Sequence, residues 1–165
     1  MSSEGAELLG RIRRSLDEVR ASATEMDADR GLSDEIINLF KEIGLFRMTM
    51  PQDWGGLELN PMEQTEALEL LATADAAAAW TVMIGSDAGY IVGFLNDAPA
   101  RKMFESIDEP AVMVVAPVGI ARVVEGGFVV NGRWSFASGS RHATVFSFGC
   151  HVVGEKGPRR TADGK

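Results

Sequence analysis

The feature that most constrains the fold is a change of sequence pattern near residue 110. Before it, apolar residues recur at steps of three and four, beginning with Leu8, Ile12, Leu16 and Val19. This spacing places them on one face of a helix. After "DEP" (108–110), β-branched and aromatic runs follow: "AVMVVAPV", "ARVVE", "FVVN" and "TVFSFGCHVV". We therefore predict an α+β fold, with an all-helical domain over 1–109 and a partial antiparallel β-barrel or sandwich over 110–165.

Capping residues divide the first part into separate helices. Polar side chains that can accept from the first free N–H groups precede several apolar runs. They are Ser33, Asn60 and Asp97. Asp75 begins the alanine-rich segment between the last two of these helices. Pro61 and Glu63 after Asn60 complete a capping box, and Gly44 is typical of a helix end. Pro51 and the Gly55–Gly56 pair predict a loop between the second and third helices.

The segment "GRWSFASGSRH" (132–142) is unusual for a plain hairpin. The separators "EGG" (125–127) and "NG" (131–132) predict hairpins, so 133–136 is predicted as a strand. Alternation along that strand would put Trp134, Phe136 and Ser138 on one face. Two rings and a hydroxyl in a row suit a flat heterocycle with polar edges, and Gly139 leaves backbone N–H groups accessible. A core hairpin with a capped end is the alternative.

Composition excludes several classes of function. The net charge of -8 disfavours nucleic acid and anionic membranes as partners. Cys150 is the only cysteine, so no disulfide can form within the chain. No metal-ligand spacing, phosphate loop, dinucleotide fingerprint or "GxSxG" elbow occurs. Without a signal-peptide core or a bilayer-spanning run, we expect a cytoplasmic protein with no metal.

Two motifs resemble the acyl-CoA dehydrogenase superfamily. "GLFRMTMPQDWGGLELNPME" (44–63) is similar to a signature of its N-terminal helical domain. "GGFVVNGRWSFASGSRHATVFSFGC" (126–150) is similar to its flavin-facing strands. "VAPVGIARV" (115–123) stands where dehydrogenases carry a Thr–Glu pair and a Gly–Ser–Asp run. "GRWSFASGS" followed by "HA" instead resembles the flavin-dependent monooxygenase branch, which includes oxygenase components of two-component aromatic hydroxylases.

The resemblance implies a flavin cofactor, either FAD or reduced FMN, and roles for particular residues. Ser138 would meet flavin N5, where an acceptor for the N5 proton slows loss of hydrogen peroxide. His142 is a second catalytic candidate, with a structural hydrogen bond as the alternative. The implied flavin contacts are Trp134, Phe136, Ala137, Ser138 and Gly139. The implied substrate contacts are Trp80, Ser86 and Tyr90, although core packing also explains Trp80. In monooxygenase relatives a histidine often lies on the fourth helix, where this chain has Ser86 and Asp87.

The same resemblance implies partners and a longer enzyme. Members of the superfamily add a C-terminal helical bundle, which is absent here, and assemble as homotetramers. A flavin reductase or an electron-transfer partner and a small organic, possibly aromatic, substrate are implied. We expect the isolated chain to bind flavin weakly, to self-associate through an open sheet edge and to show little activity. The alternatives are an acyl-CoA dehydrogenase-type FAD enzyme that oxidises a CH–CH bond, and a non-catalytic fragment or assembly module.

Overall fold

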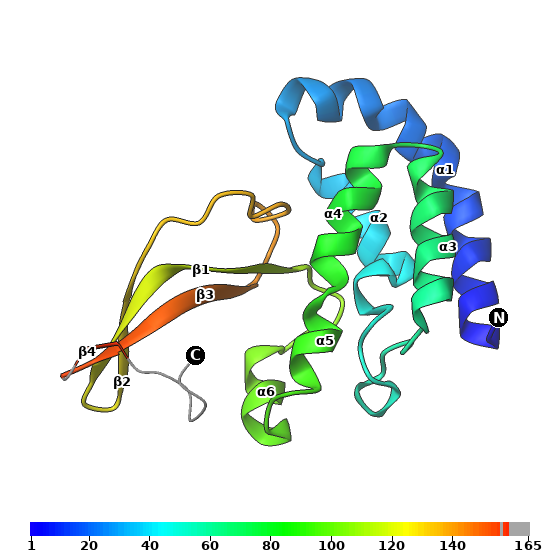
Figure 1. Ribbon diagram of the computed structural model, residues 1–165. Helices are drawn as coiled ribbons and strands as arrows, with labels where there is room; N and C mark the ends of the chain where they lie inside the picture. The colour runs from blue at the N-terminus through cyan, green and yellow to red at the C-terminus, as the bar shows by residue number, and fades with distance from the viewer. Residues whose placement is uncertain (156, 159–165) are drawn as a thin grey trace. The chain divides into compact units, whose positions relative to one another are not determined.

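The computed structural model describes residues 1–155 and 157–158, which divide into two compact units (Figure 1). The helical unit comprises Met1–Val112 together with Ser138–Val145 from later in the chain. The sheet unit comprises Met113–Ala137 and the described residues from Phe146 onward. The domain boundary at 109/110 stays a prediction, and the structure adds the turn after Ala137 to the helical unit.

Helices α1, α3 and α4 pack in succession within the helical unit. Their core contains the fully buried side chains Ile12, Phe40 and Leu71. The elements of this unit before the sheet are α1 (Ser3–Asp29), α2 (Asp34–Ile43), η1 (Leu45–Arg47), η2 (Gln52–Trp54), α3 (Pro61–Ala72), α4 (Ala76–Ser86), α5 (Ala88–Val92) and α6 (Asp97–Met103). The predicted helical region is confirmed.

Two of the three predicted caps are confirmed, and Asp75 is an additional cap, at the start of α4. The side chain of Ser33 accepts from the Ile36 N–H at 3.4 Å, and that of Asp75 accepts from the Ala78 N–H at 2.7 Å. Asn60 forms the predicted capping box with Glu63. The prediction for Asp97 is wrong by one residue, because Asn96 occupies the cap position. The Asp97 carboxylate instead pairs with Arg101 at 3.0 Å and accepts from the Trp54 indole at 3.1 Å.

The glycine-rich loop after α2 folds back on itself. Gly44 ends α2 with a φ of 87°, as its position in the sequence predicts. The Glu58 N–H donates to the Met50 carbonyl and the Leu59 N–H to the Met48 carbonyl, both at 2.9 Å. Gly56 lies so close to the Met50 carbonyl that no side chain would fit there. The predicted loop is therefore an ordered connection between α2 and α3.

The sheet has the strand order β2-β1-β3-β4. Its strands are β1 (Ala111–Val124), β2 (Gly127–Asn131), β3 (Val145–Gly154) and β4 (Gly157–Pro158). β1 and β2 form an antiparallel hairpin in which Val124 pairs with Gly127 and Ile120 with Asn131. This hairpin confirms the "EGG" turn. β2 lies at the sheet edge and all five of its residues are exposed.

The predicted hairpin at "NG" and the predicted strand over 133–136 are wrong. The chain leaves β2 at Asn131 and reaches β3 only at Val145. The Trp134 indole explains the departure: it stacks on Phe148 at 4.6 Å between ring centroids and donates to the Gly149 carbonyl at 2.9 Å. Phe136 has a φ of 62°, which no strand accommodates.

Within residues 1–155 and 157–158, no helix is long and apolar enough to cross a bilayer. The same described residues contain no group of three or more histidine, cysteine, aspartate or glutamate side chains that could hold a metal ion.

Candidate functional site

A turn over Ser138–His142 brings Ser138 against helix α4. The Trp80 indole N–H donates to Ser138 Oγ at 3.1 Å. Gly139 has a φ of 78°, and the His142 N–H donates to the Gly139 carbonyl at 3.0 Å to close the turn. A side chain added at Gly139 would touch Thr81, the next residue of α4. The structure thus brings together Trp80, Ser138 and Gly139 from the predicted site.

Arg141 and His142 attach the same turn to the connection between α1 and α2. Arg141 Nη1 donates to the Asp29 carbonyl at 3.1 Å. His142 Nδ1 lies 3.6 Å from Asp34 Oδ1, while the buried Nε2 has no hydrogen-bond partner in the described part of the chain. Only 13% of the His142 side chain is exposed. These contacts give His142 a structural place in the turn, and its catalytic role stays a prediction.

The Ser138 hydroxyl retains unused hydrogen-bonding capacity. A hydroxyl oxygen has two lone pairs and one proton. The Trp80 N–H occupies one lone pair, so the oxygen can accept once more and donate once. Ser138 is only partly buried. A polar group of a ligand can therefore approach this oxygen without first breaking the bond to Trp80.

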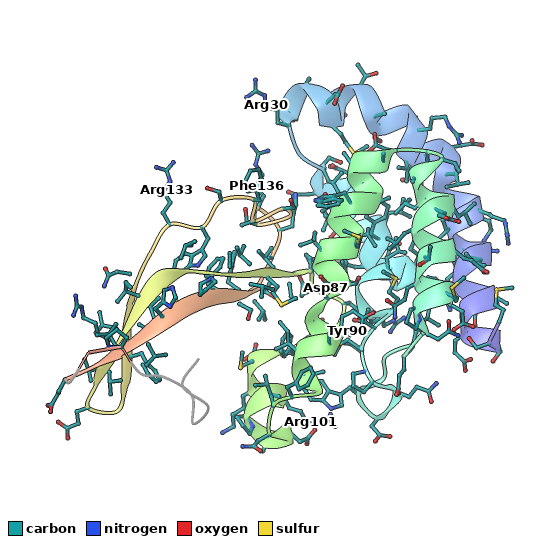
Figure 2. The ribbon with its side chains drawn as sticks, in the orientation of Figure 1. Arg30, Asp87, Tyr90, Arg101, Arg133 and Phe136 are labelled. Carbon is teal, nitrogen blue, oxygen red and sulfur yellow. The ribbon has the colours of Figure 1, made fainter. Side chains whose placement is uncertain are left out.

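The three predicted flavin contacts that precede Ser138 do not form a strand face. Trp134 packs inside the sheet unit, where Gly119 and Gly132 lie so close to its ring that neither could carry a side chain. Phe136 is 97% exposed and is labelled in Figure 2. Ala137 is partly buried. The roles of Trp134, Phe136 and Ala137 toward flavin stay predictions, and the alternation argument no longer supports them.

The predicted substrate contacts all lie on α4 and α5, but with different exposure. Trp80 is 55% exposed and Tyr90 is 48% exposed. The Tyr90 hydroxyl donates to Gln64 Oε1 at 2.6 Å. Ser86 is 1% exposed, and its hydroxyl donates to the Met83 carbonyl at 3.1 Å. Trp80 and Tyr90 are thus available to a ligand, whereas the Ser86 hydroxyl is engaged within the helix.

Asp87 was noted in the sequence beside Ser86 on the fourth helix but was given no role there. It separates α4 from α5 and is only partly buried (Figure 2). Burial raises the pKa of its carboxyl above the ordinary value. A single acidic residue inside the apolar run "AAAAWTVMIGSDAGYIV" (76–92) is the signal that could have identified it. Perturbed carboxyls of this kind concentrate at functional sites.

Comparison with known families places this arrangement in context. Residues 2–107 match the family profile "Acyl-CoA dehydrogenase, N-terminal domain". The chain belongs to this family. The resemblance in the two sequence motifs is thereby confirmed, and so is the α+β fold class of helices followed by a partial sheet.

Similar curated proteins in the family are oxygenases. Indole-3-acetate monooxygenase of Pseudomonas putida is 33% identical over 79% of the chain. The flavin-dependent monooxygenase oxygenase subunit HsaA of Mycobacterium tuberculosis is 29% identical over 92% of it. The oxygenase component of p-hydroxyphenylacetate 3-hydroxylase of Acinetobacter baumannii is 31% identical over 84% of it. The chain spans only 33% to 39% of the length of these relatives.

Solved structures give the same result for the fold. The crystal structure of HsaA from Mycobacterium tuberculosis has a TM-score of 0.87 at 28% identity, over 94% of this chain and 41% of that one. XiaF from Streptomyces in complex with FADH2 has a TM-score of 0.88 at 20% identity, which shows the fold alone, over 94% of this chain and 40% of that one. KijD3 with FMN has a TM-score of 0.80 at 25% identity, over 96% of this chain and 43% of that one. Flavin is thus bound by proteins that share this fold.

Proposed function

We propose that the chain is part of the oxygenase component of a flavin-dependent monooxygenase that acts on a small organic substrate. The observation that carries the proposal is the match of 79% to 92% of the chain to oxygenase components and subunits. The contact between Ser138 and Trp80 supports it independently, because it prepares a hydroxyl oxygen for one further partner. Acyl-CoA dehydrogenases of the family share this helical unit, so the fold alone does not distinguish a monooxygenase from a dehydrogenase.

The residues of the Ser138 turn fit the polar edge of a flavin. Ser138 Oγ has one lone pair left to accept the N5 proton of a reduced flavin, and its bond to Trp80 fixes its position. Gly139 has a positive φ, which favours glycine, and the absence of a side chain lets the turn lie close to Thr81 of α4. Reduced flavin supplies two electrons to O2, so that one oxygen atom enters the substrate and the other leaves as water.

In this proposal, the residues of the chain hold the flavin and orient its reacting atoms. Ser138 keeps a proton at N5 and thereby disfavours loss of the oxygen as hydrogen peroxide. Trp80 holds the Ser138 hydroxyl and presents an exposed ring beside it. Arg141 and His142 fix the turn to the α1–α2 connection. Each role concerns the position of an atom, so each can be tested by a substitution that preserves size.

The proposal implies partners beyond the described residues. The relatives are called an oxygenase subunit or an oxygenase component, which supports a separate reductase as the source of reduced flavin. In this proposal, the reductase determines whether the flavin supplied is FAD or FMN. A homo-oligomer, small aromatic substrates and a cytoplasmic setting belong to the same proposal. Residues 110–165 would then form the first part of a β-domain.

The test of this proposal supplies reduced flavin in air to a complete oxygenase component that contains this chain, and follows oxygen use and product formation. A monooxygenase consumes one O2 for each hydroxylated product and requires no acyl-CoA. The expected result is that an oxygenated product forms when substrate is present and that the yield of hydrogen peroxide falls by a matching amount. Reduction of bound oxidised flavin by an acyl-CoA, without oxygen incorporation from O2, would assign the dehydrogenase activity instead.

A further inference from the structure

The carboxyl of Asp87 lies on the outward side of the α4–α5 segment. The Asp87 N–H donates to the Ile84 carbonyl at 3.3 Å, and the Tyr90 N–H donates to the Asp87 carbonyl at 3.1 Å. This three-residue spacing aligns positions 84, 87 and 90 along one side, as in a 3-10 turn. The neighbours Ser86 and Ala88 are 1% and 2% exposed and face the core. Asp87 therefore shares the side of Tyr90.

Aromatic side chains flank Asp87 on this side. Trp80 precedes it by seven residues, which is two helical turns and about 10 Å along the axis. Tyr90 follows it by three residues, or about 5 Å. Trp80 and Tyr90 are both about half exposed, so their ring faces are open to a ligand. We refer to Trp80, Asp87 and Tyr90 together as the α4–α5 face.

The Asp87 carboxylate has no partner among the residues that the structure describes. No side chain or backbone N–H donates to it, and no lysine, arginine or histidine lies within ion-pair distance in the described ranges. Burial raises its pKa, with no opposing contribution from a cation. A partly desolvated carboxylate without compensation is unfavourable. A ligand that brings a positive charge would supply that compensation.

We propose that Asp87 makes the α4–α5 face selective for substrates that carry a cationic amine and disfavours substrates that carry a carboxylate. This inference rests on the proposed function, since it concerns the substrate of the same site. Trp80 connects the face to the Ser138 turn through its indole N–H. An ammonium group pairs with Asp87 and lies against the ring of Tyr90, three residues along the segment, through cation–π attraction. A ligand carboxylate meets like-charge repulsion at the same place.

Three ligands with one ring and different side-chain charge test the proposal by binding to the 165-residue chain. Tyramine is cationic, tyrosol is neutral and 4-hydroxyphenylacetate is anionic. Isothermal titration should give the tightest binding for tyramine and an affinity for 4-hydroxyphenylacetate at least about tenfold weaker, as expected for charge selection at a partly buried site. Asp87→Asn should reduce that difference to about twofold while leaving tyrosol binding unchanged.

The control variant is Glu69→Gln, which removes one negative charge from the exposed face of α3. It should keep the preference for tyramine, because a screened surface charge acts weakly at a distance. Tyr90→Leu should weaken tyramine binding more than tyrosol binding, because only tyramine gains cation–π attraction. Circular dichroism of each variant checks that the helices are retained.

Several outcomes would overturn the inference. Equal binding of tyrosol and tyramine would mean that the phenol, and not the amine, is recognised. A preference for 4-hydroxyphenylacetate, a tyramine preference that survives in Asp87→Asn, or no binding of any of the three ligands would also overturn it. These results are independent of oxygen chemistry. Failure of the proposed function would instead appear as flavin reduction by an acyl-CoA with the amine preference intact.

Discussion

At the scale of single residues, Glu63 shows how one buried side chain connects two helices. It accepts from the Ser2 N–H at the start of α1 and from the Asn60 N–H, at 3.2 Å, at the start of α3. The hydrogen bonds from Ser2, chiefly from its backbone N–H, hold the pKa of Glu63 below its ordinary value of 4.5, and the bond from Asn60 adds to this. The carboxylate form is therefore favoured in the folded state.

Glu63 should make the free energy of unfolding depend on pH in the acid range. Because its pKa is lower in the folded state, its contribution is present above the unfolded-state pKa and is lost as the pH falls through the folded-state value. Glu63→Gln should therefore be less stable than the wild type at pH 7, and the gap should narrow below pH 4.5. Urea unfolding at a series of pH values measures both stabilities. A gap that stays constant with pH would rule out the titration of Glu63 as its cause.

At the scale of elements, the Ser138–His142 turn is held by contacts far away in the sequence. Arg141 donates to the Asp29 carbonyl and packs against Gly31, while His142 approaches Asp34. Without these contacts, a five-residue turn with a glycine in the left-handed region has little to fix its position. The turn carries Ser138, so its attachment bears directly on the candidate site.

Arg141→Ala should loosen this turn selectively. The lost hydrogen bond to the Asp29 carbonyl should raise amide hydrogen exchange at the His142 N–H by about fivefold, since one hydrogen bond contributes about 1 kcal/mol. Amides in the middle of α1 and α3 should keep their protection. Hydrogen-exchange mass spectrometry compares the two regions in one sample. Equal loosening of the helices would mean that Arg141 supports the whole unit and not the turn.

Patterns among neighbouring residues predicted most helices and strands. The prediction failed where Trp134 makes contacts with residues far away in the sequence. Ser33 and Asn60 cap helices through bonds to residues three positions away or fewer, so sequence alone identified them. The "NG" hairpin failed because Trp134 packs on Phe148 and donates to Gly149, fourteen and fifteen positions later. Likewise, the pairing of Trp80 with Ser138 joins residues 58 positions apart, which no local pattern reveals. Both residues were predicted as site residues from the sequence, but the contact between them was not predicted.

At the scale of the whole molecule, the described sheet ends in an exposed strand. β2 lies at one edge of the order β2-β1-β3-β4, and Phe128, Val129 and Val130 are 56%, 49% and 52% exposed. An apolar edge strand with free backbone groups can pair with another chain. The expected self-association of the chain has its most direct structural basis here.

Val129→Lys should reduce this self-association. A lysine at the middle of β2 adds charge to the edge and disfavours pairing between two copies. Sedimentation velocity over a range of protein concentrations should show a smaller oligomer fraction than in the wild type. Glu125→Lys, in the adjacent turn and outside the strand, changes charge without altering β2 and serves as the control. An equal effect of both variants would mean that a lysine in the hairpin, inside or outside β2, lowers association, and would rule out pairing through the β2 edge as the cause.

Ser138 is proposed to keep the N5 proton of a reduced flavin in place, so that less O2 is lost as hydrogen peroxide and more reaches the substrate. The partition of O2 between oxygenated product and hydrogen peroxide measures this role. The assay supplies reduced flavin and substrate to a complete oxygenase component that contains this chain. It compares the wild type with Ser138→Ala and with Ser140→Ala, whose exposed side chain belongs to the same turn. Loss of a hydrogen bond of about 1 kcal/mol should raise the ratio of peroxide to product by roughly fivefold in Ser138→Ala. Ser140→Ala should match the wild type. An unchanged peroxide yield in Ser138→Ala would contradict the account.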